Sequence, residues 1–241
     1  MLDDVLKEMY DSFIKKWLKK YYKYILVILL YFLYQSNFLI SLLYSFGLNI
    51  TSLSKIIRTF IIYVNDLIYI FILIYMFKDE IKNGIKDFKN NKNERLTLSL
   101  ICWLVGCLIM VASTFIISLI TKSDVSNNEE LIRESIKVAP LYMFFTCSIV
   151  APLFEEMVFR NALYGLIKNK YAFIITSFLS FGLLHIIGTY TSPLDLLYVI
   201  PYGAMGASFA YLLTKTKNIT LPIMLHMLHN TILVIVQIIG R

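Results

Sequence analysis

Long runs of apolar residues recur along this chain, and their length constrains its fold more than any other feature. A helix needs about 20 apolar residues to cross the hydrocarbon core of a membrane. With 58% hydrophobic residues and a mean hydropathy of +0.69, the chain is too apolar for a soluble domain. The sequence therefore predicts an all-α, polytopic transmembrane helical bundle of about seven spans, within a range of about six to eight. The spans are expected near residues 22–46, 59–77, 97–120, 139–160, 171–187, 194–213 and 220–239.

The basic residues follow this predicted topology and do not form a nucleic-acid-binding patch. The net charge of +7 is concentrated before the first span and in every second connection after it. The positive-inside rule reads this alternation as a cytoplasmic N-terminus and an outward C-terminus, which fits an odd number of spans. We therefore expect membrane lipids as surroundings and no nucleic acid as a partner. The basic residues are Lys7, Lys15, Lys16, Lys19, Lys20 and Lys23 before the first span, Lys78, Lys82, Lys86, Lys89, Lys92 and Arg95 after the second, Lys168 and Lys170 after the fourth, and Lys215 and Lys217 after the sixth.

Three regions are expected along the chain. Residues 1–20 place apolar side chains at helical spacing with charged residues opposite, which indicates an amphipathic helix on the inner membrane surface. Residues 21–138 form an N-terminal transmembrane region, which contains a basic cytoplasmic loop at 78–96 with a weak helical pattern. Residues 139–239 form a transmembrane core, and this core carries the candidate chemistry.

Three charged residues, Glu155, Glu156 and Arg160, lie inside an otherwise apolar segment. A charge near the bilayer centre costs roughly 2.5–3.5 kcal/mol on insertion scales, so such groups usually line a polar cavity and act there. Glu156 and Arg160 are four residues apart on one helix face, which predicts an ion pair. Glu155 points about 100° away from Glu156 and has no obvious partner. We therefore expect Glu156 and Arg160 to be structural and Glu155 to be available for chemistry.

Two later spans carry polar residues that are expected at the same depth. Phe181 and His185 lie near the end of the fifth span, and His226 and Asn230 share one face of the seventh. A rise of 1.5 Å per residue puts Glu155, His185 and Asn230 roughly 20–22 Å from the neighbouring basic connections. The polar groups of three helices thus fall in one broad layer around mid-membrane. This convergence predicts a shared site.

Two further polar residues are placed around this site and not in it. His229 lies near the side of the seventh span that carries His226, and we expect it to pack beside the reacting groups. Asp66, in the second span, has two interpretations. It can bond a neighbouring helix as a packing contact, as polar residues in membrane helices commonly do, or it can face the cavity.

A carboxylate, two imidazoles and an amide can together hydrolyse an amide bond. Glu155 is suited to act as general base for a water molecule, and His185 to hold that water or to pass a proton to the leaving group. His226 and Asn230 can donate hydrogen bonds to the oxyanion that forms. Such a site needs no nucleophilic serine, no thiol and no cofactor. The competing hypothesis is zinc bound by Glu155, His185 and His226, whose side chains suit that ion although their spacing matches no known zinc motif.

These residues also form a recognisable set of motifs. In chain order they are Glu155-Glu156-x-x-x-Arg160, Phe181-x-x-x-His185 and His226-x-x-x-Asn230. The set resembles the CAAX prenyl endopeptidase and bacteriocin-processing family (CPBP, or Abi) of intramembrane proteases, over about residues 139–239. The resemblance implies a helical bundle with a membrane-embedded catalytic cavity that opens to the cytosolic side. It further implies that Glu155 and His185 activate water, and that His226 and Asn230 form the oxyanion site.

The leading functional hypothesis is an intramembrane endopeptidase that cleaves a peptide or lipidated peptide, of CAAX-like or bacteriocin type. The alternative is a non-catalytic self-immunity or scaffold protein that binds a peptide in the same cavity. A small transporter with a proton-relay carboxylate is a third hypothesis, but it would need inverted repeats or broken helices, which the sequence does not show. A composition rich in Lys, Ile and Asn indicates a low-GC bacterium, so the expected location is the bacterial cytoplasmic membrane.

Overall fold

The fold is helical throughout the part of the chain that is described. The computed structural model describes residues 2–123 and 125–240, with all side chains there except those of residues 2–9, 11 and 13. Within the described residues, six helices are long and apolar enough to cross a membrane. Two further helices, which meet at an angle of 58°, give a seventh candidate span if they are counted together. The prediction of an all-α, polytopic bundle is confirmed. The six helices are Lys55–Met76, Lys92–Thr121, Pro140–Leu166, Lys170–Ile187, Pro193–Thr216 and Thr220–Ile239, and the bent pair is Ile14–Gln35 with Phe38–Ser45.

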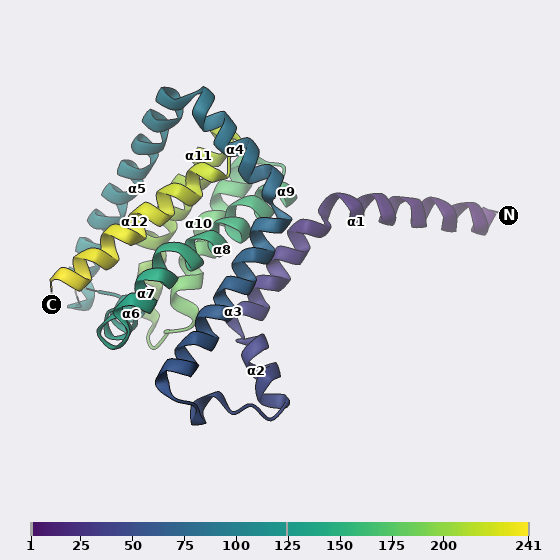
Figure 1. The fold of residues 1–241 in the computed structure, drawn as a ribbon. Helices are drawn as coiled ribbons and strands as arrows, with labels where there is room; N and C mark the ends of the chain where they lie inside the picture. The colour runs from purple at the N-terminus through teal and green to yellow at the C-terminus, as the bar shows by residue number, and fades with distance from the viewer. Residues whose placement is uncertain (1, 124, 241) are drawn as a thin grey trace.

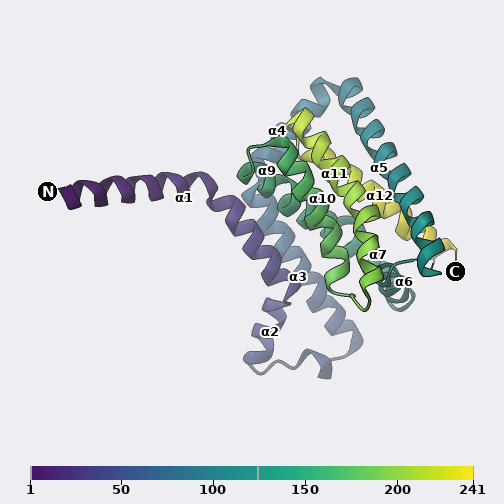
Figure 2. The same cartoon turned by 180° about the vertical axis from the view of Figure 1, so that it is seen from behind.

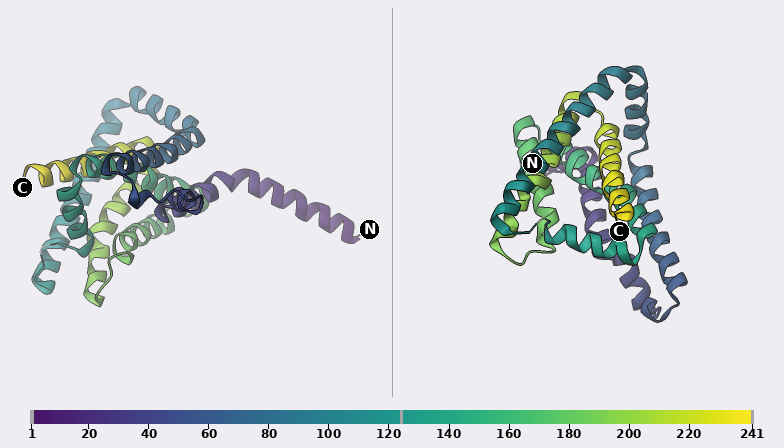
Figure 3. Two further views of the ribbon diagram at one scale, coloured as in Figure 1. Left: turned by 60° about the horizontal axis from the view of Figure 1, so that its bottom comes forward. Right: turned by 90° about the vertical axis from the view of Figure 1, so that its left-hand side faces the viewer.

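The N-terminal segment and the first predicted span form one long helix. Helix α1 runs from Leu2 to Gln35 without a break at residue 20, so the N-terminal segment and the first span are one continuous helix. The first part of α1 extends away from the bundle (Figures 1 and 3). The chain turns after α1 because Asn37 adopts a left-handed conformation with φ of 51°, and α2 (Phe38–Ser45) follows. The short turn η1 (Ile50–Ser52) then leads into α3 (Lys55–Met76).

The segment 78–96 is helical, as its weak sequence pattern indicated. Helix α4 (Lys78–Asn90) is followed at once by α5 (Lys92–Thr121), with Asn91 between them. Helix α4 packs on the start of the last helix through Gly84, where a Cβ atom would overlap the side chains of Asn218 and Thr220. The Asn218 amide donates a hydrogen bond of 2.8 Å to the Gly84 carbonyl. Helix α4, which the sequence pattern indicated only weakly, is therefore stabilised by a contact with a distant part of the chain.

A charged group outside the membrane spans holds α4 in place. The Asp87 carboxylate accepts hydrogen bonds from Arg95 at 2.9 Å and from Asn218 at 2.8 Å. The Arg95 guanidinium is the main cause that lowers the pKa of Asp87 to about 2. Because the folded-state pKa lies below the unfolded one, this stabilisation is present above about pH 4 and is lost as the pH falls toward 2.

We expect Asp87→Asn to lower the free energy of unfolding by about 1 kcal/mol at neutral pH, since a partly exposed pair contributes only modestly. Thermal unfolding in detergent measures this difference, which should shrink below about pH 4. Asp79→Asn, at an exposed position of the same helix, is the matched control. Equal melting temperatures of wild type and Asp87→Asn at pH 7 would contradict the assignment.

The best-buried helix is α11 (Val199–Thr216), which follows the short turn η4 (Pro193–Tyr198) and lies beside α10 (Lys170–Ile187) (Figure 2). Glycines let the two helices approach closely. A Cβ on Gly203 would lie 2.8 Å from the Phe178 ring, and one on Gly206 would lie 2.8 Å from the Ser177 carbonyl oxygen. The last helix, α12 (Thr220–Ile239), packs against both α11 and α8.

The fourth predicted span is irregular, and the irregularity is centred on the glutamates. Two wide π-helical turns flank α8, the six-residue helix that carries Glu155 and Glu156. In the first wide turn the Ala151 N–H donates to the Thr146 carbonyl, and Pro152 has no N–H to continue the pattern. The elements are α6 (Asn127–Val138), α7 (Pro140–Phe145), η2 (Thr146–Val150), α8 (Ala151–Glu156), η3 (Met157–Ala162) and α9 (Leu163–Leu166).

The bundle has two chemically different ends. At one end α4 meets the connection between α11 and α12, where Lys217 contacts Tyr164 at the end of α9. We call this the basic end, because the lysine-rich connections gather there. At the other end, which we call the distal end, α6 meets the connection after α10, and Asn127 donates to the Thr189 carbonyl at 3.0 Å. Figure 1 shows α4 at the top of the view and α6 at the lower left, near the C-terminus.

Candidate active site

The residues that the sequence assigned to chemistry surround one cavity of about 610 Å³. Glu155 comes from α8, His185 from α10, and His226 and Asn230 from α12, and all four line this cavity. The cavity also reaches α5, α6 and α11. Side chains that are 30 to 75 positions apart in the chain are thus brought to one place, as their similar depth predicted.

The predicted ion pair between Glu156 and Arg160 is present. Arg160 Nε lies 3.2 Å from Glu156 Oε2, and both side chains are fully buried. The guanidinium carbon of Arg160 lies 4.2 Å from the centre of the Phe181 ring, a cation–π contact. Phe181 therefore serves as an apolar wall that also attracts the buried cation.

His226 lies between the two glutamates, a contact that the sequence analysis did not predict. Its Nδ1 is 2.8 Å from Oε1 of Glu156, and its Nε2 is 3.8 Å from Oε2 of Glu155. An ionised carboxylate can only accept, so the short contact puts a proton on Nδ1. In the neutral ring, Nε2 then presents a lone pair toward Glu155 and the cavity.

In this buried cluster the carboxylates outnumber the guanidinium groups by one. Glu155 and Glu156 carry two negative charges when ionised, and Arg160 carries one positive charge. Burial disfavours an uncompensated charge, and in this cluster Oε2 of Glu155 faces Nε2 of His226 at 3.8 Å. The geometry thus supplies a carboxylate and an imidazole that can exchange one proton.

His185 is held by its own helix and by α11. Its Nδ1 lies 2.8 Å from the Phe181 carbonyl oxygen, which can only accept, so Nδ1 carries the proton and Nε2 is the free acceptor. The imidazole stacks on the Tyr202 ring, with centroids 4.4 Å apart and planes at 17°. Tyr202 in turn contacts Ser126, at the start of α6, through its hydroxyl at 2.7 Å. Sequence reasoning missed Tyr202.

Asn230 is held by the wide turn before the glutamates. Its Nδ2 donates a hydrogen bond of 2.9 Å to the Cys147 carbonyl oxygen. That carbonyl is open because the next donor in the wide turn would be Pro152, which has no N–H. A carboxamide has two N–H groups, so one remains for a ligand. Pro152 was the sequence signal for this arrangement.

His229 lies beside the four residues and also lines the cavity. Its Nδ1 accepts a hydrogen bond of 3.3 Å from the indole N–H of Trp103, and Cys107 is 3.9 Å away. His229 is therefore fixed to α5, as a neighbour of the site. Trp103 was not among the residues predicted for the site.

Of the two interpretations of Asp66, the structure supports the packing contact. Asp66 does not line the cavity but is buried near α1 and α7. Its carboxylate accepts hydrogen bonds from the hydroxyls of Tyr34 and Tyr142, both at 3.2 Å, and from Asn65 at 3.3 Å. These donors satisfy the buried carboxylate, so Asp66 connects three helices as a packing contact.

The cavity extends from the four residues toward the distal end. Its lining on α5 begins at Met110 and ends at Ser118, in the second half of that helix, and its lining on α12 runs from His226 to Gln237. Toward the basic end the cavity borders on a cluster of apolar side chains, of which Met205 and Phe209 also line the cavity. They are Cys102, Met205, Phe209, Leu212, Leu221 and Leu225, with Phe88 of α4 packed against them.

An opening to the cytosolic side, which the family resemblance implied, thus conflicts with the cytoplasmic N-terminus that the positive-inside rule predicts. The lysine-rich connections lie at the basic end, and the cavity extends from the middle of the bundle toward the distal end. Only one of the two expectations can hold for this chain.

The zinc hypothesis can be tested directly. Among the described residues, no group of three or more His, Cys, Asp or Glu side chains is placed to hold a metal ion. We expect protein purified without chelators to contain no stoichiometric zinc, and its activity to be unchanged by a chelator. Elemental analysis measures the metal content. One zinc per chain, lost together with activity on chelation, would instead establish Glu155, His185 and His226 as ligands.

Comparisons with known proteins agree with the motifs. Residues 137–232 match the family model of the Rce1-like type II CAAX prenyl endopeptidases. The putative membrane peptidase YdiL of Bacillus subtilis is 32% identical over 169 residues, which are 67% of this chain and 63% of that protein. The membrane-embedded CAAX protease MroQ of Staphylococcus aureus is 32% identical over 140 residues, 54% of this chain and 53% of the relative. The UPF0177 protein YvdC of Lactococcus lactis is 30% identical over 125 residues, 51% of this chain and 46% of the relative.

The matches cover part of each relative, between 46% and 63% of its length. No solved structure matches the chain significantly. YdiL and MroQ are bacterial membrane proteins by name and source, and the apolar spans agree with a multi-pass bacterial membrane protein. The segment matched by the family model contains every motif residue from Glu155 to Asn230. Residues 137–232 of this chain are therefore similar to the Rce1-like CAAX protease family.

Proposed function

We propose that this chain is an intramembrane endopeptidase that hydrolyses a peptide bond with a water molecule activated by Glu155. The observation that carries the proposal is the meeting of Glu155, His185, His226 and Asn230 around one cavity. The four groups come from three helices and supply a base, a proton carrier and hydrogen-bond donors, which acyl transfer to water needs.

The reaction can be written with these groups alone. Glu155 takes a proton from water, aided by His185, whose free Nε2 can orient the same molecule. The water oxygen bonds to the peptide carbonyl carbon, and the electron pair of the C=O bond moves to its oxygen. When the C–N bond breaks, the leaving nitrogen receives the proton from Glu155. The products are a carboxylic acid and an amine.

The developing oxyanion needs donors, and the site has two candidates. Asn230 keeps one N–H of its amide beside the bond to Cys147. His226 can donate from Nε2 only when both of its ring nitrogens carry a proton. Glu156, which faces Nδ1 at 2.8 Å, stabilises the ring in this protonated form. Glu156 is thus a positioning residue that sets the tautomer and charge of His226.

The relatives indicate the class of substrate. MroQ is named a CAAX protease and YdiL a putative membrane peptidase. We propose a peptide or lipidated peptide as substrate for this chain, including peptides of bacteriocin type. A purely binding role in self-immunity would use the same cavity but would not depend on the proton-accepting atom of Glu155.

Membrane proteomics separates the two roles. Strains that express wild type, Glu155→Gln or Glu134→Gln at equal levels are compared for the N-termini of their membrane proteins. Glu134 is an exposed carboxylate on α6 that does not line the cavity, so its variant is the matched control. We expect a set of cleavage products that is absent only with Glu155→Gln. Identical sets in all three strains would contradict the protease.

A further inference from the structure

His229 differs from the other two histidines in the nitrogen that carries its proton. The indole N–H of Trp103 can only donate, so its hydrogen bond of 3.3 Å makes Nδ1 of His229 an acceptor. The thiol of Cys107, 3.9 Å from Nδ1, can donate weakly to the same lone pair. In the neutral ring the proton of His229 then lies on Nε2. In His185 and His226, by contrast, Nδ1 carries the proton and Nε2 is the acceptor of the neutral ring.

The N–H at Nε2 of His229 is available to a group that enters the cavity. His229 lines the cavity and is 8% exposed, whereas Trp103 does not line it. The two nitrogens of an imidazole point in diverging directions, so Nε2 is turned away from Trp103. Nε2 makes no hydrogen bond to a described residue but remains accessible, unlike the unpaired nitrogens of Arg160, which are enclosed by protein. Because buried N–H groups are normally paired, this one is suited to a carbonyl oxygen of a ligand.

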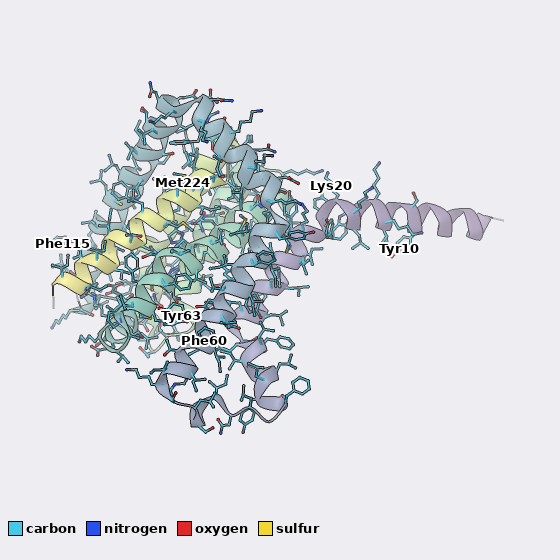
Figure 4. All side chains as sticks on the ribbon, viewed as in Figure 1. Tyr10, Lys20, Phe60, Tyr63, Phe115 and Met224 are labelled. Carbon is cyan, nitrogen blue, oxygen red and sulfur yellow. The ribbon has the colours of Figure 1, made fainter. Side chains whose placement is uncertain are left out.

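The position of this N–H sets which carbonyl it can reach. Helices α5 and α12 lie side by side (Figure 4, where Phe115 on α5 and Met224 on α12 are labelled). His229 is held against α5, whereas Asn230 is held by the wide turn η2. Residues three apart on a helix, such as His226 and His229, have Cβ atoms about 5–6 Å apart. In an extended peptide every second carbonyl repeats after about 7 Å, so a peptide that reacts beside His226 and Asn230 brings a second carbonyl near His229.

We propose that His229 binds the substrate, by donating its Nε2 hydrogen to a backbone carbonyl oxygen close to the scissile bond but not part of it. Trp103 is a positioning residue, because it acts through His229 by fixing the proton on Nε2. The bound carbonyl takes no part in the reaction, so the contact strengthens binding of the peptide and leaves kcat unchanged. The proposal rests on the proposed function, since it requires a peptide in the cavity. The position of the proton does not rest on it.

The first experiment locates the proton without any activity. The chain has three histidines, so a nitrogen NMR spectrum of histidine-labelled protein in detergent contains three rings. We expect one ring with its proton on Nε2 alone, and its signals should be absent from His229→Gln. Trp103→Phe keeps an aromatic ring but removes the N–H, so it should release this histidine into a mixture of tautomers. Trp17→Phe, at an exposed position of α1, is the matched control and should change nothing. A proton on Nδ1 of His229 in the wild type would overturn the proposal.

The second experiment measures cleavage of a quenched fluorescent peptide that spans a cleavage site found by the proteomic comparison. We expect His229→Leu, which has no N–H, to raise KM about tenfold, the worth of one hydrogen bond, with kcat within about twofold of the wild type. His229→Gln keeps an N–H near the position of Nε2 and should hold KM within about threefold. Trp103→Phe should raise KM about two- to threefold, because only part of its population carries the proton on Nε2.

The outcomes separate this contact from the protease itself. Equal KM in wild type, His229→Leu and Trp103→Phe, or a loss confined to kcat, would overturn the contact while the protease stands. Should His229→Leu fail to fold, the KM of Trp103→Phe decides alone. If Glu155→Gln leaves all cleavage products intact, the protease fails and this substrate contact fails with it, while the NMR result still stands.

Discussion

Glutamine in place of Glu155 is expected to lower the rate of peptide-bond cleavage by about 10²–10⁴-fold, the contribution of a positioned general base. Each tenfold loss corresponds to about 1.4 kcal/mol, so the barrier should rise by about 3–5 kcal/mol. Glutamine has nearly the shape of glutamate but cannot take a proton from water. The effect should appear in kcat, because the proton is transferred only as the transition state forms.

The same substitution should leave the fold intact. The Glu155 side chain lies on the cavity, is 13% exposed and is 3.8 Å from His226 Nε2. Its removal also relieves the unbalanced negative charge of the cluster. The melting temperature in detergent should therefore be equal to or slightly above that of wild type. Glu134→Gln serves as control for the rate, and equal cleavage by wild type and Glu155→Gln would remove Glu155 from the mechanism.

Much of the fold could be predicted from the lengths of the apolar runs. Each run produced a helix, and the polar break at Ser36 and Asn37 became the bend between α1 and α2. The segment 78–96 could not be predicted with the same certainty. Gly84 reads as a helix breaker, but in the structure it allows α4 to approach Asn218 and Thr220. A glycine that serves a contact more than 130 residues away cannot be recognised from its neighbours.

The residues of the site could be predicted from the sequence, but most of the contacts between them could not. The spacing of four residues on one helix predicted the ion pair between Glu156 and Arg160. The number of residues between each histidine and the nearest basic connection predicted that the histidines lie in the same layer. The bond between Glu156 and His226 joins positions 70 residues apart, so no local spacing reveals it. Trp103, which donates to His229 across 126 residues, was missed for the same reason. Pro152 was a local signal, because a proline inside a span leaves carbonyls open.

Alanine in place of Arg160 is expected to lower the free energy of unfolding by about 3–5 kcal/mol, the cost of leaving one partner of a buried ion pair uncompensated. Glu156 would remain fully buried without its cation, and the cation–π contact with Phe181 would be lost as well. Arg133→Ala is a closely matched control, since Arg133 also pairs with a glutamate four residues before it, but at a partly exposed position. That variant should lose no more than about 1 kcal/mol.

A double variant separates the charge from the packing at this site. Glu156→Gln with Arg160→Met removes both buried charges, keeps an oxygen that can accept from His226 Nδ1, and fills the space beside Phe181. Replacing a whole buried ion pair is often neutral or stabilising, so the double variant should recover most of the stability that Arg160→Ala loses. Thermal unfolding of the single and double variants measures the coupling. An unchanged melting temperature of Arg160→Ala together with complete loss of cleavage would instead place Arg160 among the residues that act on the substrate, because a merely structural cation cannot be removed from full burial without destabilising its partner.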